Sequence, residues 1–375
     1  MKKFYLLLLL LIHSYAYSQE IQREFSVNTG QLFKLQSTIG GSISVKGEGQ
    51  GKIRVAITHN GGDEFKFDFQ ESAQGITLLA TGPKNWRENT KIDFQVTVPE
   101  NFNLDLSTSG GNIELQNIKG NLNGRTSGGN LVVNQTEGAH SLKTSGGNIA
   151  IHSSSGEGSV STSGGNIAVN TLSGKFSLLT SGGNIVLESS KLEGDVRTSG
   201  GNIVCKNTEI NGEVKTSGGN ITVDKAPQGI SVATSGGNIQ INSANTFAVA
   251  KTSGGNITII EVDGWITAHT SGGNVTARMV GDPSTGKRDV ELLSSGGTLT
   301  LTVPEGLGMN IEIETNYNTR NNWGKEPEIK SDFEISTRKE DKGNMIHLYG
   351  SGQVGDGKNT IRLKTTGGSV YLKKG

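Results

Sequence analysis

The sequence predicts an all-β protein, a single-stack parallel β-solenoid of about ten regular 18-residue coils with irregular capping coils at both ends. Three observations lead to this fold class. The unit Thr-Ser-Gly-Gly-Asn, followed by an aliphatic residue, recurs at a strict spacing of 18 residues. Within each unit, apolar and polar residues alternate with the period of two that strands require. Glycine accounts for 55 of 375 residues, which indicates a backbone that turns sharply and often.

Residues 1–18 have the pattern of a secretory signal peptide. Two lysines near the start are followed by a leucine-rich apolar stretch that ends at about Ile12, and the small residues Ala16 and Ser18 predict cleavage before Gln19. The stretch is too short to span a bilayer, and no later segment is apolar enough for a membrane helix. We therefore expect an exported protein, in the periplasm, at the cell surface or outside the cell, with no membrane span in the mature chain.

Residues 19–105 and 300–375 are expected to form irregular β coils that cap the two ends of the stack. In the first segment, polar and apolar residues alternate clearly over 91–98. The second segment mirrors the first, because the Val-Pro-Glu sequence at 98–100 is echoed at 303–305 before another strand-like run. Such caps would protect the exposed strand edges of the regular array between them.

Residues 106–299 hold the regular array, and we number each repeat from its asparagine as position 0. The ten asparagines, each 18 residues after the previous one, are Asn112, Asn130, Asn148, Asn166, Asn184, Asn202, Asn220, Asn238, Asn256 and Asn274. A further copy of the unit, Ser-Ser-Gly-Gly-Thr-Leu at 294–299, comes after six extra residues. The turn-rich segment 281–286 predicts that a loop is inserted there.

The alternation within the repeat predicts which side chains point inward. Positions +1, +3 and −6 are mainly Ile, Leu and Val, and the invariant threonine at −4 has the same phase, whereas the serine at −3 is expected to point outward. Cys205, the only cysteine, occupies position +3, so we expect a small buried hydrophobe and no intramolecular disulfide. The paired glycines are expected to turn the corner through positive φ and close approach of stacked coils. The asparagine amides are expected to form a ladder along the stack.

The chain resembles a bacterial family of unknown function known as the "putative adhesin" domain. The resemblance is carried by the Gly-Gly-Asn-Ile and Gly-Gly-Ser-Ile steps, by the Val-Pro-Glu element before the first regular coil, and by the segment 361–370, Ile-Arg-Leu-Lys-Thr-Thr-Gly-Gly-Ser-Val. It covers nearly all of the mature chain. The resemblance implies a parallel β-solenoid on an exported or envelope protein, and it supplies no catalytic motif.

Composition and motifs argue against several classes of function. The chain has 35 basic and 35 acidic residues, and this zero net charge does not suit a protein that must displace counterions from nucleic acid. The six histidines have no metal-like spacing, and the sequence contains neither a nucleophile elbow nor a phosphate-binding loop. We therefore expect no enzyme activity, no metal and no cofactor.

Two features are candidates for contact with a partner. An intermittent basic stripe at position −5 comprises Arg125, Lys143, Arg197, Lys215, Lys251 and His269. A solvated face and a contact for an anionic glycan are both open interpretations of this stripe. Trp86 and Trp323 lie in polar, turn-like stretches, where an aromatic ring either stacks on a sugar or anchors a loop against the rod.

Two further patterns leave alternatives open. Asp195 and Glu213 both occupy position −7, which predicts stacked outward carboxylates. They are either neutralised by the nearby basic residues or act as an acid/base pair on a polysaccharide. An apolar stripe at position +2 runs from Val132 to Val204 over five coils. Three interpretations of this stripe are open. Its residues simply favour β-strands, a terminal segment of the chain covers them, or they form a surface that contacts a partner.

The function predicted from these observations is that of a non-catalytic exported scaffold, an adhesin or a cell-envelope interaction protein. Its partner would be a cell-surface glycan or an envelope protein. One alternative is an ice-binding solenoid whose ranks of Thr and Ser order water, although the threonine is expected to face inward. Another is a polysaccharide-acting β-helix enzyme, although such enzymes usually have longer coils and a groove rich in carboxylates.

Overall fold

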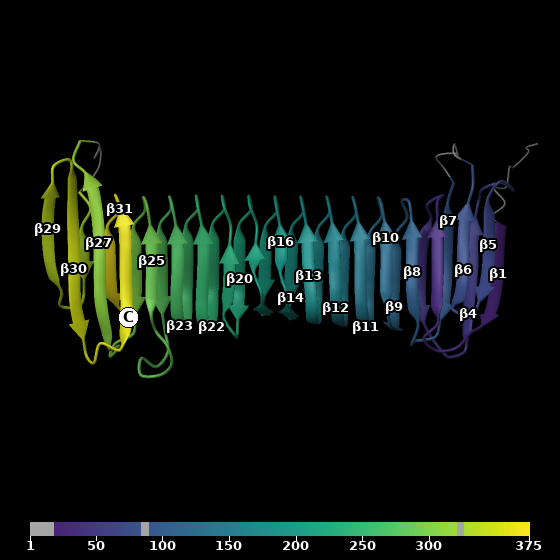
Figure 1. Cartoon of the computed structure of the whole chain (residues 1–375), viewed down its shortest axis with the longest axis horizontal. Helices are drawn as coiled ribbons and strands as arrows, with labels where there is room; N and C mark the ends of the chain where they lie inside the picture. The colour runs from purple at the N-terminus through teal and green to yellow at the C-terminus, as the bar shows by residue number, and fades with distance from the viewer. Residues whose placement is uncertain (1–18, 84–89, 321–325) are drawn as a thin grey trace, which may run out of the picture.

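The computed structural model describes residues 19–83, 90–320 and 326–375. The described residues form strands and turns without a helix, which confirms the all-β class. The strands lie side by side along one long axis, with the N-terminal strands at one end and the C-terminal strands at the other (Figure 1). Trp86, Trp323 and the predicted signal peptide lie outside the described residues.

Thirty-two strands follow one another along the described residues. The first nine are β1 (Gln19–Ser26), β2 (Leu32–Ser37), β3 (Ser42–Gly47), β4 (Lys52–His59), β5 (Lys66–Ser72), β6 (Gly75–Thr81), β7 (Ile92–Val98), β8 (Asn103–Thr108) and β9 (Ile113–Lys119). The middle strands are β10 (Leu122–Thr126), β11 (Leu131–Thr144), β12 (Ile149–Thr162), β13 (Ile167–Thr180), β14 (Ile185–Glu188), β15 (Lys191–Glu193), β16 (Val196–Thr198), β17 (Ile203–Lys206), β18 (Glu209–Asn211), β19 (Val214–Lys215), β20 (Ile221–Ala226), β21 (Ile230–Ala233), β22 (Ile239–Thr252), β23 (Ile257–Thr270) and β24 (Val275–Met279). The last strands are β25 (Val290–Ser294), β26 (Leu299–Val303), β27 (Met309–Asn318), β28 (Ile329–Ser331), β29 (Ser336–Lys342), β30 (Met345–Val354), β31 (Asn359–Thr366) and β32 (Val370–Lys374).

Parallel pairing between successive repeats builds the long sheet. Leu131 pairs with Ile149, Ile149 with Ile167, and Ile167 with Ile185, so that each residue lies beside the one 18 positions later. This register places equivalent positions of the repeat next to one another along the long axis. The period in the sequence therefore becomes a set of continuous side-chain rows, some inside the stack and some on its surface.

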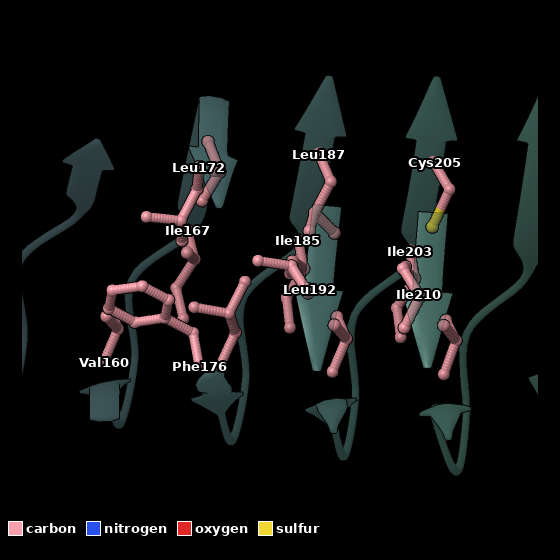
Figure 2. Packing of buried hydrophobic residues seen from close by; sticks show 14 of the residues in the cluster. Val160, Ile167, Leu172, Phe176, Ile185, Leu187, Leu192, Ile203, Cys205 and Ile210 are labelled. Atoms are coloured by element: carbon pink, nitrogen blue, oxygen red, sulfur yellow. The ribbon is translucent and has the colours of Figure 1, made fainter. Parts of the chain in front are cut away.

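The aliphatic positions of the repeat fill the interior. Side chains at +1, +3 and −6 are buried as expected, and Figure 2 shows Ile185, Leu187, Ile203 and Cys205 at equivalent places in adjacent repeats. Cys205 is fully buried, and desolvation raises the pKa of its thiol to about 12. Position +6 is buried in nine of the ten regular repeats, which the alternation did not predict, and −8, in phase with −6, is buried wherever it is not glycine. One buried aliphatic side chain contributes only about 1.5–3 kcal/mol, so the fold depends on stacked rows rather than on a single repeat.

The invariant residues of the repeat join each corner to the preceding one. Thr144 Oγ1 donates to the carbonyl oxygen of Gly129 at 2.8 Å and accepts from the N–H of Gly147 at 3.2 Å. Asn130 Oδ1 accepts the main-chain N–H of Asn148 at 2.8 Å. Equivalent bonds recur along the array. The asparagine ladder is therefore a ladder from side chain to backbone, and it differs from the expected stack of mutually bonded amides.

The paired glycines are required for space. A Cβ on Gly147 would lie 1.9 Å from the carbonyl oxygen of Gly129, whereas a Cβ on Gly146 would meet no atom closer than 3.7 Å. Neither glycine of this pair has a positive φ, so the expectation that positive φ turns this corner is wrong for the regular repeats. Left-handed φ occurs instead at position +5, on residues other than glycine, inside β9, β11, β12 and β13 and between the shorter strands of the next two repeats. These residues are Asn117, Gln135, Ser153, Thr171, Ser189 and Asn207.

The loop predicted at 281–286 connects β24 to β25 and is fixed by Arg288. This side chain is only 2% exposed. Its guanidinium donates to the carbonyl oxygens of Val280 and Thr285 at 2.7 and 2.9 Å, and to Asp263 Oδ1 at 2.6 Å. A single buried arginine thus satisfies backbone carbonyls that the inserted residues would otherwise leave without partners.

Antiparallel strands lie at both ends of the long sheet. β4 pairs antiparallel with β1 and β7, and β5 pairs antiparallel with β6. At the other end, β30 pairs antiparallel with β27 and β29. The ends thus combine hairpins with parallel strands, whereas the sequence predicted irregular coils alone. The outermost strands β1 and β29 are rich in charged residues, a composition that discourages pairing with a second chain.

Candidate functional site

The outward side chains at positions −7, −5 and −3 form a continuous surface, which we call the serine face. Position −3 is serine in all ten regular repeats, and these serines are exposed. The rows are continuous because the strands pair in register, Ser107 with Arg125, Arg125 with Lys143, and Lys143 with Ser161. The predicted basic stripe at −5 is therefore a real row on this face. It consists of three pairs of neighbouring basic residues, separated by Ser161 and Leu179 and by Ala233.

Arg125 and Lys143 make up the first pair. Both are exposed, and they are direct partners in the register of β10 and β11. Neither side chain forms an ion pair or a hydrogen bond with the described residues. A carboxylate in the neighbouring row, Asp105, instead pairs with Lys34 at 3.7 Å and accepts from Asn123 Nδ2 at 2.6 Å. Two like charges thus lie side by side without a counter-charge from the protein, an arrangement that costs stability.

A shallow depression of about 290 Å³ adjoins the first pair. Its lining includes both cations, Gln36, and the serines Ser109, Ser127 and Ser145, and no carboxylate. Guanidinium and ammonium groups bind carboxylate, sulfate or phosphate, and hydroxyl and amide groups can donate to or accept from an uncharged polar ligand. The depression therefore offers two positive charges and several neutral hydrogen-bonding groups to solvent.

Arg197 and Lys215 make up the second pair, which the protein neutralises itself. Arg197 Nη2 contacts Asp195 Oδ2 at 2.8 Å and Glu213 Oε2 at 3.1 Å. Lys215 Nζ lies 3.9 Å from Glu213 Oε1. Asp195 Oδ1 also accepts the main-chain N–H of Glu213 at 3.0 Å. The expected charge network is therefore present here, and the geometry gives no support to an acid/base pair formed by these two carboxylates.

Lys251 and His269 make up the third pair, partners in the register of β22 and β23. His269 Nε2 lies 2.9 Å from Glu291 Oε2, and the same carboxylate pairs with Arg362 at 3.6 Å. Lys251 forms no ion pair with any residue that the structure describes. The third pair is thus intermediate between the other two, since one of its members has a carboxylate partner.

The predicted apolar stripe at +2 lies just after the asparagine of each repeat, whereas the serine face lies before it. Four of its members are half-buried and Ala168 is exposed. The row continues beyond Val204 as Thr222 and Gln240, so its apolar character is confined to the middle of the array. The stripe is therefore a short, partly shielded strip, and it offers a weaker basis for a partner surface than the serine face.

Sequence reasoning missed an aromatic stack at position +9. Phe247 and Trp265 are register partners whose ring centroids lie 5.1 Å apart with an interplanar angle of 16°. Lys287 lies over the Trp265 ring at 5.1 Å, and Phe247 packs over Gly229. The 18-residue spacing of the two aromatics would have revealed this stack. Because both outer ring faces are occupied, it supports the inserted loop and offers no free platform for a sugar.

A second hollow, of about 530 Å³, lies on the C-terminal strands β27, β29, β30 and β31. Its lining includes Glu312, Arg338, Tyr349 and Arg362. Arg338 lies over the Tyr349 ring at 4.8 Å and pairs with Glu340 at 2.8 Å, so this cation already has a carboxylate partner. These residues come from irregular strands outside the repeat, and no sequence pattern connects them.

His140 is buried in the interior. Its Nε2 lies 2.8 Å from Thr136 Oγ1, and its Nδ1 lies 2.9 Å from the carbonyl oxygen of Gly138. Desolvation lowers the pKa of His140, while hydrogen bonds to backbone carbonyls partly oppose that shift. Its place in a row of core side chains, beside the Phe176 ring at 5.5 Å, indicates a structural role.

The described ranges contain no group of three or more His, Cys, Asp or Glu residues that could hold a metal ion. In the same part of the chain, we find no helix with the length and apolarity needed to cross a membrane.

No family model and no curated protein matches the chain. Several solved structures are similar to it. A "putative adhesin" from Bacteroides fragilis is 22% identical, with a TM-score of 0.33, over 64% of this chain and 96% of that one. A "putative adhesin" from Parabacteroides distasonis is 14% identical, with a TM-score of 0.27, over 76% and 97%. A "putative lipid binding protein" from the same species is 12% identical, with a TM-score of 0.18, over 94% and 96%.

The first two names agree with the family that the sequence resembles. The TM-scores and identities are low, so these likenesses carry no argument about what the chain binds.

Proposed function

We propose that the mature chain is an exported, non-catalytic β-solenoid of about ten regular coils that acts as an adhesin or a cell-envelope interaction scaffold. The serine face is the surface that meets its partner. The partner is a molecule of a cell surface or envelope, and the chain acts in the periplasm, at the cell surface or outside the cell.

One observation carries this proposal. The invariant Thr, second Gly and Asn of each repeat are committed to contacts between repeats, as shown by the bonds of Thr144, Gly129 and Asn130. Only the serine and the variable outward residues remain for a partner. The invariant Thr, second Gly and Asn thus join neighbouring repeats, whereas the invariant Ser and the variable outward side chains face solvent. This division of labour is typical of a repeat scaffold whose surface determines binding.

The alternatives have less support. An ice-binding surface would need exposed rows of threonine and serine. The threonines at −4, from Thr126 to Thr270, are buried, and the exposed row of serines is flanked by basic side chains. For a polysaccharide-acting enzyme, the carboxylates of Asp195 and Glu213 are already engaged by Arg197. Thermal hysteresis of the purified chain, or release of reducing ends from a polysaccharide, would favour one of these functions over adhesion.

Two measurements test the proposal. Cells that express the full-length chain are fractionated and treated with protease from outside, and the purified mature chain is tested for binding to intact cells and envelope preparations. We expect an exported protein that binds such surfaces above an unrelated protein of similar size. A cytoplasmic protein, or one that binds no cell or envelope preparation, would contradict the proposal.

A further inference from the structure

The contrast between the first and second cation pairs points to a specific ligand chemistry. Beside the second pair, position −7 holds Asp195 and Glu213, which neutralise both cations. Beside the first pair, the same position holds Asn123 and Ser141, which carry no charge. The two sites are otherwise built alike, with cations at −5, serines at −3 and parallel register between neighbouring strands. The first pair thus lacks the counter-ions that the protein supplies to the second.

We propose that the first pair, together with the serines beside it, binds an acidic polysaccharide, and that a carboxylate or sulfate of one sugar lies between Arg125 and Lys143. This inference rests on the proposed function, because it names the partner class of the serine face. The bound anion replaces the counter-charge that Asp195 and Glu213 provide at the second pair.

The chemistry of the depression matches such a sugar. The Arg125 guanidinium can hold an anion with two parallel N–H bonds, and the Lys143 ammonium adds a compact second charge. The amide of Gln36 and the hydroxyls of Ser127 and Ser145 lie within the same lining and can bond to ring hydroxyls. An anion between two adjacent cations also relieves their mutual repulsion, which increases the gain on binding.

The surroundings favour a polysaccharide over an anionic membrane or a nucleic acid. Next to the first pair, the −5 row continues as Ser107 on one side and Ser161 on the other, and the nearby charges of Lys34 and Asp105 pair with each other. The exposed apolar side chain on this row is Leu179, beyond Ser161, and one leucine is too little apolar surface to enter a bilayer. Nucleic acid binding needs contacts with many phosphates, whereas only two cations on this part of the face lack partners. The exposed serines at −3 continue beyond the depression as Ser163 and Ser181, in repeats that bond to one another, so an extended chain of sugars can lie along them.

The test measures binding of the purified mature chain to polygalacturonate and to dextran sulfate, with uncharged dextran as a control. We expect binding to at least one anionic polymer, no binding to dextran, and weaker binding at higher salt because exposed charges are screened. In Arg125→Ser/Lys143→Ser we expect the affinity for the anionic polymer to fall about tenfold or more, because charge-assisted hydrogen bonds are removed. The matched control Arg197→Ser/Lys215→Ser removes the same two charges and should change affinity less than about twofold.

A reciprocal pair of variants tests the role of the counter-charge without removing a cation. Ser141→Glu places a carboxylate where Glu213 stands beside the second pair, and it should weaken binding as much as the double removal does. Asp195→Asn/Glu213→Ser exposes the second pair and should strengthen binding. The thermal unfolding midpoint of each variant shows that it is folded.

Several outcomes would overturn the inference. They are binding of neither anionic polymer, equal losses on removal of the first and second pairs, no effect of Ser141→Glu, or a preference for phosphatidylglycerol vesicles over both polymers. If the chain binds cells but neither polymer, the inference fails and the adhesive function stands. If the chain binds neither cells nor polymers, the proposed function fails with it.

Discussion

The two glycines of one pair should respond very differently to alanine, although they are adjacent in the sequence. In Gly147→Ala, the new Cβ would lie 1.9 Å from the carbonyl oxygen of Gly129 and 2.4 Å from its carbonyl carbon. In Gly146→Ala, the nearest atom would be at 3.7 Å, an ordinary contact. Neither glycine has a left-handed φ, so backbone strain does not distinguish them. The comparison isolates the effect of close packing between repeats.

The expected loss of stability in Gly147→Ala follows from the hydrogen bonds that the clash would break. Moving the corner at 147 away from the preceding repeat disrupts three hydrogen bonds, namely Thr144 Oγ1 to Gly129 O, Gly147 N to Thr144 Oγ1, and Asn148 N to Asn130 Oδ1. At about 1 kcal/mol net for each bond, the free energy of unfolding should fall by about 3 kcal/mol. Gly146→Ala should stay within about 0.5 kcal/mol of wild type, or stabilise slightly by restricting the unfolded chain.

Urea unfolding of the mature chain, followed by circular dichroism, measures both variants. The midpoint and the slope of the transition are needed, because a repeat protein can lose cooperativity. Equal shifts for the two variants, or a Gly147→Ala midpoint that matches wild type, would refute the close-packing explanation of the corner.

Three other perturbations test separate parts of the structure. Burial lowers the pKa of His140 below its ordinary 6.5, so the unfolded state takes up the proton first and stability should decline as pH falls below that value. In His140→Leu, which copies the leucine at 122 in the same row, the free energy of unfolding should decline less between pH 7 and 5. If its pH profile matched that of wild type, His140 would not be the cause of the decline. Arg288→Ala should lower stability by about 1–3 kcal/mol and expose residues 281–287 to protease. Arg288→Lys should not restore protection, because the single ammonium nitrogen cannot reach the three acceptors that Nε, Nη1 and Nη2 of the guanidinium contact. Resistance of both variants to cleavage would contradict this role. Ile203→Asp buries a charge and should destabilise by about 4 kcal/mol or more, whereas Ser199→Asp on the exposed row should change stability by about 0.5 kcal/mol or less. Similar urea midpoints for these two would show that the inward and outward phases are wrong.

The regular array could be predicted because one pattern determines both its period and its phase. Alternation placed Ile203, Cys205 and the threonines inside and the serines outside, and the burial of these residues agrees. The left-handed φ at position +5 could not be predicted, because it is carried by residues as different as Gln135 and Thr171. Close approach of neighbouring repeats at the paired glycines was predicted, but the sequence did not show that the second glycine alone makes it.

The candidate site was only partly predictable. The stripe at −5 could be read from the sequence, and so could the carboxylates at −7 that neutralise Arg197 and Lys215. The lack of a partner for Arg125 and Lys143 was not predicted, because it depends on Asp105 pairing with Lys34, which comes from an irregular strand. The burial of Arg288 likewise depends on Asp263 and on backbone carbonyls of the inserted loop, which no pattern in the sequence connects.

Deletion of one whole repeat tests most directly the claim that 18 residues form one self-contained layer of the stack. Residues 221–238 contribute β20 and β21 and lie away from the first cation pair. Removing them should leave β17 and β19 facing β22 in the same register, because the repeats on either side pair through equivalent positions. We expect the protein that lacks 221–238 to keep a thermal unfolding midpoint close to that of wild type. Deletion of the nine residues 221–229 should lower the midpoint sharply. Similar midpoints for the two deletions would contradict the claim.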